Sequence, residues 1–529
     1  MSARRPATLA TGGMVASSHP LASQAGARVL AHGGNAVDAA LAMAAVTWLT
    51  LPGQCGIGGD AFAVVRDPDG SVRTVNGSGY GPDGGIPDFY RDRGLSAIPL
   101  DGALAVAVPG APAALAALHA YGASMSLLEL WEPAARIAER GLPCSAKTRA
   151  DVQAALHAIR SDVGLASVYT PTGAVPRVGD RLPQVDLART IRALASDPSS
   201  FYTGAIAEHC VAALQYSGAP FTGDEWVAGA SVPVESALTG TYAGTTVHQT
   251  PLPTPGWMVL QQAALCDGEL GTMPWLSAPA IDRMARAAAL SFEDRLRWCG
   301  SDNDGVEQAL SATNIADGRA RLASWEAAGA FAVSGGDTTS FVAVDAEGRA
   351  VSFIHSLAFT FGAKFTVPGT GVALNNRLGR GAYLIDGHPN EVSPRRKPLH
   401  TLNAWIVTGS DGELMHVGNT PGGDGQVQWN MQLLSHLLDH GLDPQETVEA
   451  PRFTVYPGSD ANALGHAPEL RIEGRVGREV LRSLSDMGHQ VNVLDAYGAE
   501  GSAQVVSMTQ GVMSGGSDPR QEGVVLGVE

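Results

Sequence analysis

The stretch that decides the fold begins Gly335-Gly336-Asp337-Thr338-Thr339-Ser340-Phe341-Val342-Ala343-Val344 and continues through Asp345-Ala346-Glu347-Gly348-Arg349 to Ala350-Val351-Ser352-Phe353-Ile354-His355-Ser356. Its first and last parts are rich in β-branched and aromatic residues, and the residues between them are typical of a turn. The sequence therefore predicts a β-hairpin that opens directly after a pair of glycines.

The length of the turn predicts how the two strands of this hairpin pair. If the turn from Asp345 to Arg349 closes the hairpin, the opposed pairs are Val344–Ala350, Val342–Ser352, Ser340–Ile354 and Thr338–Ser356. Opposed residues have Cβ atoms roughly 5 Å apart. We therefore expect the hydroxyl groups of Thr338 and Ser356 to lie side by side at the start of the first strand.

Thr338 has a chemical use beyond its place in a strand. A threonine hydroxyl is a weak nucleophile unless a base takes its proton, and a free α-amine on the same residue can be that base. Cleavage of the peptide bond between Asp337 and Thr338 would create this amine, and Ser356 could orient it. The alternative is an ordinary hairpin with Thr and Ser present for their β-propensity, and the pattern alone favours that alternative.

A second glycine pair, Gly422-Gly423, precedes a helix-like run at 426–438. Successive backbone N–H groups before a helix can converge on an anion. Such a nest could hold the oxyanion of an attacked amide, which is worth about 3 kcal/mol per donor. Taken alone, however, the pair is explained better by a plain turn that begins a helix.

The rest of the chain reads as helices around further strands. Residues 17–48 carry a helical pattern that is broken at 32–35, and a glycine-rich turn then leads into a strand at 61–65. Residues 111–321 are mostly helical in pattern, and short alternating runs such as 404–407 indicate more strands.

Gly56-x-Gly58-x-x-Ala61 is superficially similar to a dinucleotide-binding loop. That loop requires a strand before it and a helix after it, whereas the pattern here is helix, then strand. We therefore predict a tight helix-to-strand turn.

Composition excludes several classes of protein. With 45% hydrophobic and 16% charged residues the chain is not intrinsically disordered. The net charge of −17 and the lack of a long basic run argue against a nucleic-acid partner. The longest apolar stretch, 39–51, is too short to span a bilayer, and 1–19 lacks the apolar core of a secretory signal. The five cysteines form no C-x-x-C pair, so we expect reduced thiols, no metal site and a cytoplasmic location.

Many segments resemble the γ-glutamyltranspeptidases and their acylase relatives, in the same order along nearly the whole chain. These segments are 15–22, 32–40, 56–59, 106–110, 201–204, 338–339, 421–423, 450–453 and 517–520. The resemblance implies an α+β protein with the four-layer αββα sandwich of the N-terminal-nucleophile hydrolases.

The resemblance also implies a maturation step and a set of catalytic residues. The precursor would cleave itself between Asp337 and Thr338 into a large chain, 1–337, and a small chain, 338–529, which stay associated. Thr338 would be the nucleophile, Ser356 the hydroxyl that contacts its amine, and Gly422 and Gly423 the oxyanion hole. No cofactor is implied, and whether further copies assemble is left open.

This sequence departs from the family pattern where a γ-glutamyl group would be held. The departures are Ser78 for an Arg, Ala358 for an Asn, Arg377 for a Gln, Arg380 for an acidic residue, and His400-Thr401 for a Ser–Ser pair. A carboxylate at position 380 would bind an ammonium group, whereas a guanidinium repels it and favours a carboxylate or carbonyl.

We therefore expect Arg377, Arg380, His400 and Thr401 to bind a small anionic amide that lacks an α-amine. The leading candidate is oxamate, which would give oxalate and ammonia. The alternative for the two arginines is that they pair with local acids or face solvent. The alternatives for the function are a γ-glutamyltransferase or glutathione hydrolase, a glutaryl (cephalosporin) acylase, or a non-catalytic binding protein that kept the fold.

Overall fold

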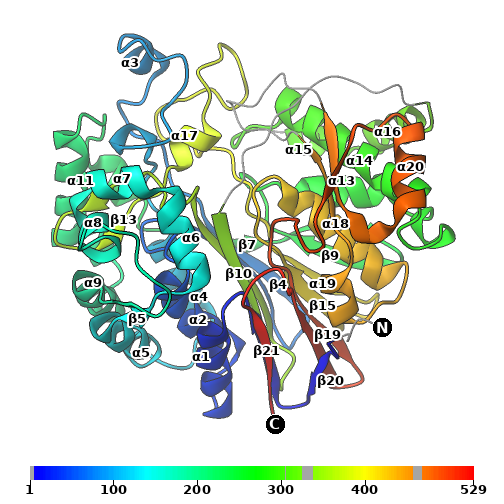
Figure 1. The fold of residues 1–529 in the computed structure, drawn as a ribbon, viewed down its shortest axis with the longest axis horizontal. Helices are drawn as coiled ribbons and strands as arrows, with labels where there is room; N and C mark the ends of the chain where they lie inside the picture. Colours follow the sequence, from blue (N-terminus) through cyan, green and yellow to red (C-terminus); the bar gives the residue numbers. More distant parts are fainter. Residues whose placement is uncertain (1–4, 304, 325–336, 457–467) are drawn as a thin grey trace.

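Two seven-stranded antiparallel sheets stack face to face at the centre of the molecule (Figure 1). The computed structural model describes residues 5–303, 305–324, 337–456 and 468–529, and of residue 337 it describes only the backbone. We call one sheet the hairpin sheet because it contains the predicted hairpin. The other is the glycine-loop sheet, because one of its strands leads into Gly422-Gly423.

Each sheet draws its strands from distant parts of the chain. In order across the hairpin sheet lie β21 (Val524–Val528), β2 (Gly13–Ser17), β10 (Asp337–Asp345), β11 (Ala350–Ala358), β3 (Asp60–Arg66), β4 (Val72–Gly77) and β7 (Val234–Ser236). In order across the glycine-loop sheet lie β1 (Thr8–Ala10), β20 (Val512–Ser517), β19 (Gln504–Thr509), β15 (Leu414–Asn419), β14 (Trp405–Thr408), β9 (Thr245–Gln249) and β8 (Leu238–Tyr242).

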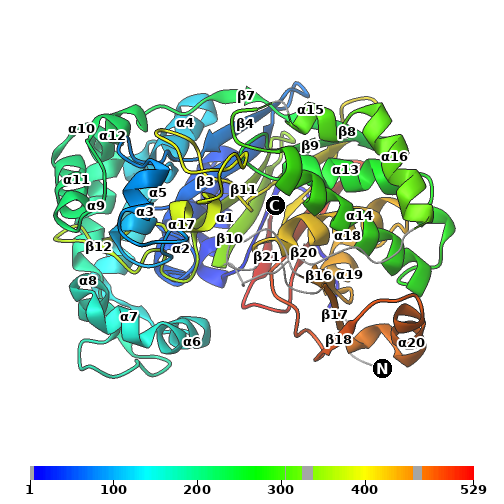
Figure 2. The same cartoon turned by 90° about the horizontal axis from the view of Figure 1, so that it is seen from above.

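Helices cover the outer face of each sheet, and Figures 1 and 2 show the two helical layers on opposite sides of the strands. The hairpin-sheet side carries α1 (Pro20–Ala31), α2 (Ala36–Thr50), α4 (Ala111–Gly122), α5 (Leu127–Arg140), α9 (Val185–Ser196), α10 (Ser200–Thr203), α11 (Ala205–Tyr216) and α12 (Asp224–Ala228). The glycine-loop side carries α13 (Gly256–Cys266), α14 (Ala278–Trp298), α15 (Gly305–Ala309), α16 (Ala312–Ala323), α18 (Gly425–Leu438), α19 (Pro444–Glu449) and α20 (Arg478–Asp486).

Smaller elements join these layers. They are α3 (Pro87–Arg91), α6 (Ala146–Ala154), α7 (Leu156–Ser161), α8 (Val163–Tyr169), α17 (Arg377–Gly381), β5 (Leu142–Pro143), β6 (Arg181–Leu182), β12 (Thr366–Val367), β13 (Val372–Ala373), β16 (Phe453–Tyr456), β17 (Glu469–Glu473) and β18 (Val491–Leu494).

Three apolar layers hold the sandwich together. Phe62, Val342 and Ile354 of the hairpin sheet pack against residues such as Ile406 and Val506 of the other sheet. The second layer lies under α2, a mostly apolar helix that is buried along its whole length. The third lies between the glycine-loop sheet and α13, α14 and α18. The αββα architecture is confirmed.

Most of the predicted elements are present. The helical pattern at 17–48 forms α1 and α2 with its break at 32–35, and the glycine-rich segment is a turn into β3, as predicted. The prediction for 111–321 was incomplete, because β7, β8 and β9 interrupt the helices there and complete one edge of each sheet. These short strands pair only with residues far away in sequence or with each other, so their local pattern was weak.

The hairpin register is confirmed from Val344–Ala350 to Thr339–His355 but shifts at Thr338. Asp337 pairs with Ala358, so two residues of β11, Ser356 and Leu357, stand opposite the single residue Thr338. The predicted ladder pair Thr338–Ser356 is therefore wrong, and a β-bulge takes its place. The cause is tertiary: the Leu357 N–H donates to the Gln54 carbonyl at 3.0 Å.

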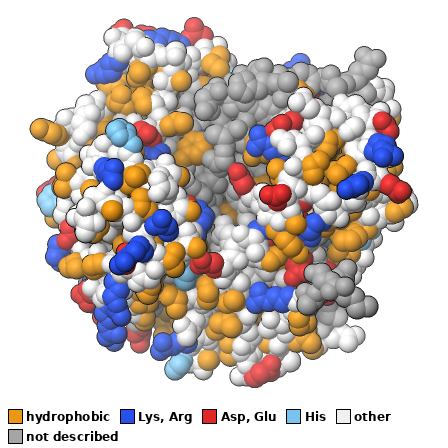
Figure 3. All heavy atoms as spheres, in the orientation of Figure 1, with side chains coloured by type: hydrophobic (Ala, Val, Ile, Leu, Met, Phe, Trp, Pro, Cys, Tyr) orange, Lys and Arg blue, Asp and Glu red, His pale blue; other side chains and the backbone are white. Residues whose placement is uncertain are grey.

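Within the described part of the chain, no helix has both the length and the apolar character needed to cross a bilayer. On the face seen in Figure 3, Lys and Arg side chains are interspersed with Asp and Glu ones and do not gather into one basic patch.

Candidate active site

Thr338 and Ser356 meet at the start of β10 despite the bulge. Thr338 Oγ1 donates to Ser356 Oγ at 3.1 Å, and the two residues are 2% and 1% exposed. Ser356 Oγ also accepts the N–H of Ala358 at 2.8 Å, which fixes the serine rotamer. The two hydroxyl groups that the sequence placed together are thus in hydrogen-bond contact. The side chain of Asp337 lies outside the described residues.

A row of polar side chains continues from this pair across the edge of the hairpin sheet. Ser356 faces Asp60 on β3, and Ser78 follows the β4 residue that faces Ala61. Asp60 is fully buried, directly before the apolar residues 61–65 of its strand, and accepts the Gly79 N–H at 3.3 Å. Sequence reasoning missed Asp60. The signal was a lone acidic residue directly before a run of buried apolar positions.

Arg377 pairs with Asp60. Its Nε donates to Asp60 Oδ2 at 3.0 Å, and both side chains are fully buried. Burial raises the pKa of the Asp60 carboxyl above its usual value, and the guanidinium beside it opposes part of that shift. For Arg377 the structure therefore shows the local acid partner that the alternative interpretation described.

Arg380 lies on the next turn of α17 and reaches the end of β11. Its Nη1 donates to the Ala358 carbonyl at 3.1 Å, and its guanidinium carbon lies 4.4 Å from the centre of the Phe359 ring. The side chain is buried. Arg380 thus contacts the end of the strand that carries Ser356.

His400 and Thr401 lie on the other side of this cluster. His400 Nε2 lies 3.0 Å from Ser78 Oγ and 3.9 Å from Asp60 Oδ2. Burial, and then the positive charges of Arg377 and other nearby basic side chains, hold the pKa of His400 well below its usual value, so its ring is neutral at pH 7. Ser78 and Asp60 approach the same ring nitrogen, so the three do not form a Ser-His-Asp triad.

Two polar atoms of this segment have no hydrogen-bond partner among the described residues. They are Nδ1 of His400 and Oγ1 of Thr401, and both are buried. Buried polar atoms are normally hydrogen-bonded, so these two atoms each retain unused hydrogen-bonding capacity.

The glycine pair has the backbone conformation of an anion-binding loop. Gly422 and Gly423 have φ of 126° and 56°, in the region that favours glycine. A Cβ on Gly422 would lie 2.1 Å from the indole ring of Trp429. Neither glycine N–H donates to an acceptor among the described residues. Both amides are thus available to an oxyanion.

Asn419 joins this loop to the hairpin. Its Nδ2 donates to the carbonyls of Phe341 and Phe353 at 3.2 and 3.0 Å, one on each hairpin strand. Gly422 follows only three residues later, so the loop is held against the strands that carry Thr338 and Ser356. Asn419 therefore connects the Gly422-Gly423 loop to the hairpin. The sequence alone did not show this connection.

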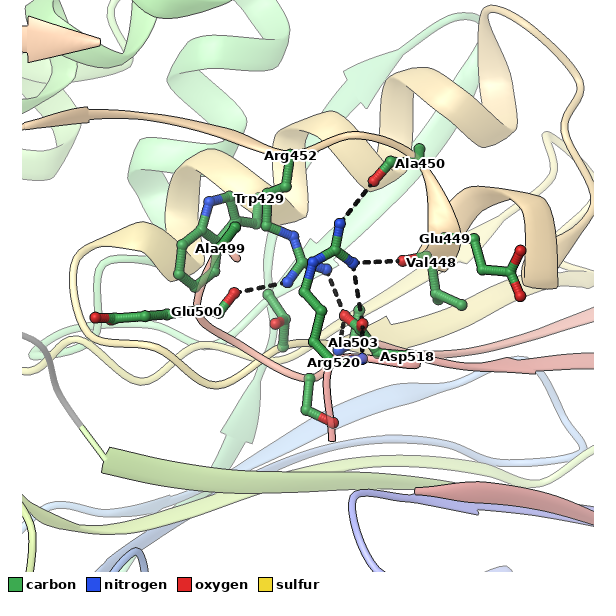
Figure 4. A network of polar contacts seen from close by, with 12 residues as sticks. Trp429, Val448, Glu449, Ala450, Arg452, Ala499, Glu500, Ala503, Asp518 and Arg520 are labelled. Atoms are coloured by element: carbon green, nitrogen blue, oxygen red, sulfur yellow. Dashed lines mark hydrogen bonds and ion pairs between the residues drawn. The ribbon is translucent and has the colours of Figure 1, made fainter. Parts of the chain in front are cut away.

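A buried ionic network lies beside Trp429 (Figure 4), the residue whose indole ring lies close to Gly422. The Arg452 guanidinium carbon lies 5.1 Å from the centre of a Trp429 ring, and Arg452 Nη2 donates to Asp518 at 2.6 Å. Arg520 also donates to Asp518, at 3.0 Å. Burial, then the charge of Arg520, lowers the pKa of Arg452 to about 10, so it is still charged at pH 7. The segments 450–453 and 517–520 therefore build a scaffold for the loop.

Comparison with known proteins agrees with this geometry. The profile described as gamma-glutamyltranspeptidase matches residues 22–528. The chain belongs to the gamma-glutamyltranspeptidase family. It is accordingly an N-terminal-nucleophile amidohydrolase proenzyme.

Relatives within the family carry different names. The glutathione hydrolase-like YwrD proenzyme of Bacillus subtilis (strain 168) is 33% identical over 97% of this chain and 98% of its own length. The oxamate amidohydrolase proenzyme of Klebsiella pneumoniae is 30% identical over 98% of this chain and 99% of its own length. The crystal structure of a cephalosporin acylase from Bacillus halodurans superimposes with a TM-score of 0.91 at 29% identity, covering 100% of this chain and 98% of that one.

Proposed function

We propose that this proenzyme cleaves itself between Asp337 and Thr338 and then hydrolyses a small anionic amide, with oxamate as the leading substrate. Residues 1–337 and 338–529 would remain associated, because both contribute strands to both sheets. The observation that carries the proposal is the hydrogen bond from Thr338 Oγ1 to Ser356 Oγ at the start of β10.

In the proposed reaction Thr338 Oγ attacks the amide carbon, and the new α-amine of Thr338 takes the hydroxyl proton. The carbonyl oxygen becomes an oxyanion that the N–H groups of Gly422 and Gly423 stabilise. Collapse of this intermediate breaks the C–N bond, and the amine returns its proton to the departing ammonia. Water then attacks the acyl-enzyme ester in the same way, which releases the carboxylic acid and restores Thr338. No metal or organic cofactor takes part.

The positions of the two arginines distinguish their roles in the proposed binding of an anionic substrate. Arg377 pairs with the buried Asp60 carboxylate. Arg380 lies beside the end of β11, where its Nη1 donates to the Ala358 carbonyl, two residues after Ser356. Because of this position we assign the substrate carboxylate chiefly to Arg380, with Thr401 and His400 as neutral contacts.

The main rival is a glutathione hydrolase or a cephalosporin acylase, since relatives with these names match at comparable identity. The experiment compares ammonia release from oxamate with p-nitroaniline release from γ-glutamyl-p-nitroanilide and with hydrolysis of a glutaryl amide. We expect oxamate to be the best of the three. A kcat/KM for either of the other substrates above that for oxamate would overturn the substrate assignment.

A further inference from the structure

One arginine on the outer helix α14 contacts both sides of the candidate site. Arg295 Nη1 donates to Asp424 Oδ1 at 2.9 Å, and Asp424 directly follows Gly422-Gly423. Arg295 Nη2 donates to the backbone carbonyl of His400 at 2.5 Å. The side chains of Arg295 and Asp424 are 1% and 0% exposed. A single guanidinium thus bridges the glycine loop and the segment that carries His400 and Thr401.

The two contacts cross the predicted cleavage site. Arg295 belongs to residues 1–337, whereas His400 and Asp424 belong to 338–529. The guanidinium is planar and its two terminal nitrogens are fixed relative to one another, so it sets the spacing between its two acceptors. A lysine has one charged nitrogen on a flexible stem and cannot hold two acceptors in the same way.

We propose that Arg295 is a positioning residue through which the large chain holds the oxyanion loop and the substrate-binding segment of the small chain in their working arrangement. Arg295 acts through Asp424 on the N–H groups of Gly422 and Gly423, and through the His400 carbonyl on Thr401. The inference rests on the proposed function, because it assigns a role to Arg295 in that reaction.

The test compares three variants of the two-chain enzyme with wild type, using oxamate and γ-glutamyl-p-nitroanilide as probes. R295M removes both contacts, and we expect kcat to fall at least tenfold with a raised KM, because misplaced oxyanion donors lose transition-state stabilisation. D424N removes only the charged partner of the loop, so kcat should fall while KM stays within about twofold. R295K should recover part of the lost kcat but leave KM raised.

Arg283→Met is the matched control. Arg283 lies on the same helix, is also largely buried, and donates to the Leu265 carbonyl and to Glu269, away from the site. R283M should lower the melting temperature and leave kcat and KM within about twofold of wild type. This control separates loss of folding from loss of positioning.

The proposal is overturned if processed R295M has wild-type kcat and KM, or if R283M loses kcat to the same extent. Where R295M gives no folded protein, R295K and D424N decide, and wild-type kinetics in both would also overturn it. A failure of the proposed function gives a different result. In that case Thr338→Ala still turns over the probes, whatever the kinetics of the Arg295 variants.

Discussion

The hydroxyl of Thr338 donates to the hydroxyl of Ser356 at 3.1 Å at a point where the ladder between their two strands is interrupted. The bulge places two residues of β11 opposite Thr338, and Ala358 adopts a left-handed φ of 83° immediately after it. The hydrogen bond between Thr338 and Ser356 therefore joins two side chains at a distorted strand end. β-Bulges of this kind are common beside active sites.

The first prediction concerns Thr338. Thr338→Ala should run as one band of the full-length chain on a denaturing gel and release no ammonia, because it lacks the hydroxyl needed for cleavage and turnover. Wild type should run as two bands. Thr338→Ser, which keeps a hydroxyl, should still mature. Turnover by Thr338→Ala, or an unbroken chain in active wild type, would contradict the nucleophile assignment.

The second prediction concerns Ser356. Ser356→Ala removes the acceptor of the Thr338 hydroxyl, and we expect kcat to fall roughly tenfold to a hundredfold by loss of orientation. Ser340→Ala is the control, because Ser340 Oγ is buried on the same strand pair and has no hydrogen-bond partner among the described residues. Steady-state kinetics of the processed proteins would check this. Equal kcat values in the two variants would refute a specific role for Ser356.

The third prediction concerns the glycine loop. Gly422→Ala adds a Cβ that would lie 2.1 Å from Trp429, at a φ that other residues rarely adopt. The loop must shift, and we expect kcat to fall about a hundredfold to a thousandfold, the effect of losing one oxyanion donor. Gly441→Ala has a φ of 63° and nothing within 4 Å, so it tests the backbone strain alone, about 1–2 kcal/mol. Wild-type kcat in Gly422→Ala would exclude this loop from the reaction.

The fourth prediction concerns Arg380. Arg380→Ala should raise KM for oxamate at least tenfold, since it removes the cation assigned to the substrate carboxylate. KM for an uncharged amide should change much less. Arg91→Ala is the control, because Arg91 is an arginine at the surface that already forms an ion pair with Asp386. An unchanged KM for oxamate in Arg380→Ala would remove Arg380 from the binding site.

The fifth prediction concerns pH. His355 is fully buried, with Nε2 3.0 Å from Thr47 Oγ1, and burial lowers its pKa to about 3. Between that value and the unfolded pKa of about 6.5, only the unfolded state binds the proton. The contribution of His355 to the free energy of unfolding is thus fully present above about pH 6.5. As the pH falls below that value, the free energy of unfolding decreases by up to about 1.4 kcal/mol per pH unit because of this group.

Thermal unfolding of wild type and His355→Gln between pH 7.5 and 5 would check this slope. The glutamine keeps a polar group but does not titrate, so the melting temperature of the variant should depend less on pH. Parallel curves for the two proteins would show that His355 does not contribute.

Local patterns explain which parts of the site could be predicted from the sequence. The five-residue turn set the register from Val344–Ala350 to Thr339–His355, because each ladder pair follows from the one before it. Glycine can adopt positive φ in any surroundings, so the conformation of the Gly422-Gly423 loop before α18 was compatible with the sequence from the start. The resemblance to the family then added the four-layer fold, which the structure confirms.

Other features were decided only in the folded molecule. The bulge at Thr338 depends on the Gln54 carbonyl, which captures the Leu357 N–H from 303 residues away in the chain, 357 minus 54. The partner of Arg377 is Asp60, at a sequence separation of 317 residues. Buried charges need a partner, but the sequence does not say which one.

The sequence by itself therefore determined the hairpin, its hydroxyl residues and the glycine loop, because these depend on neighbouring residues and on backbone conformation. Tertiary structure alone decided that Asp60 compensates Arg377, that Arg380 lies beside the end of β11, and that Arg295 joins the two sides of the site. These depend on distances between segments that meet only when the two sheets stack and exclude water from between them.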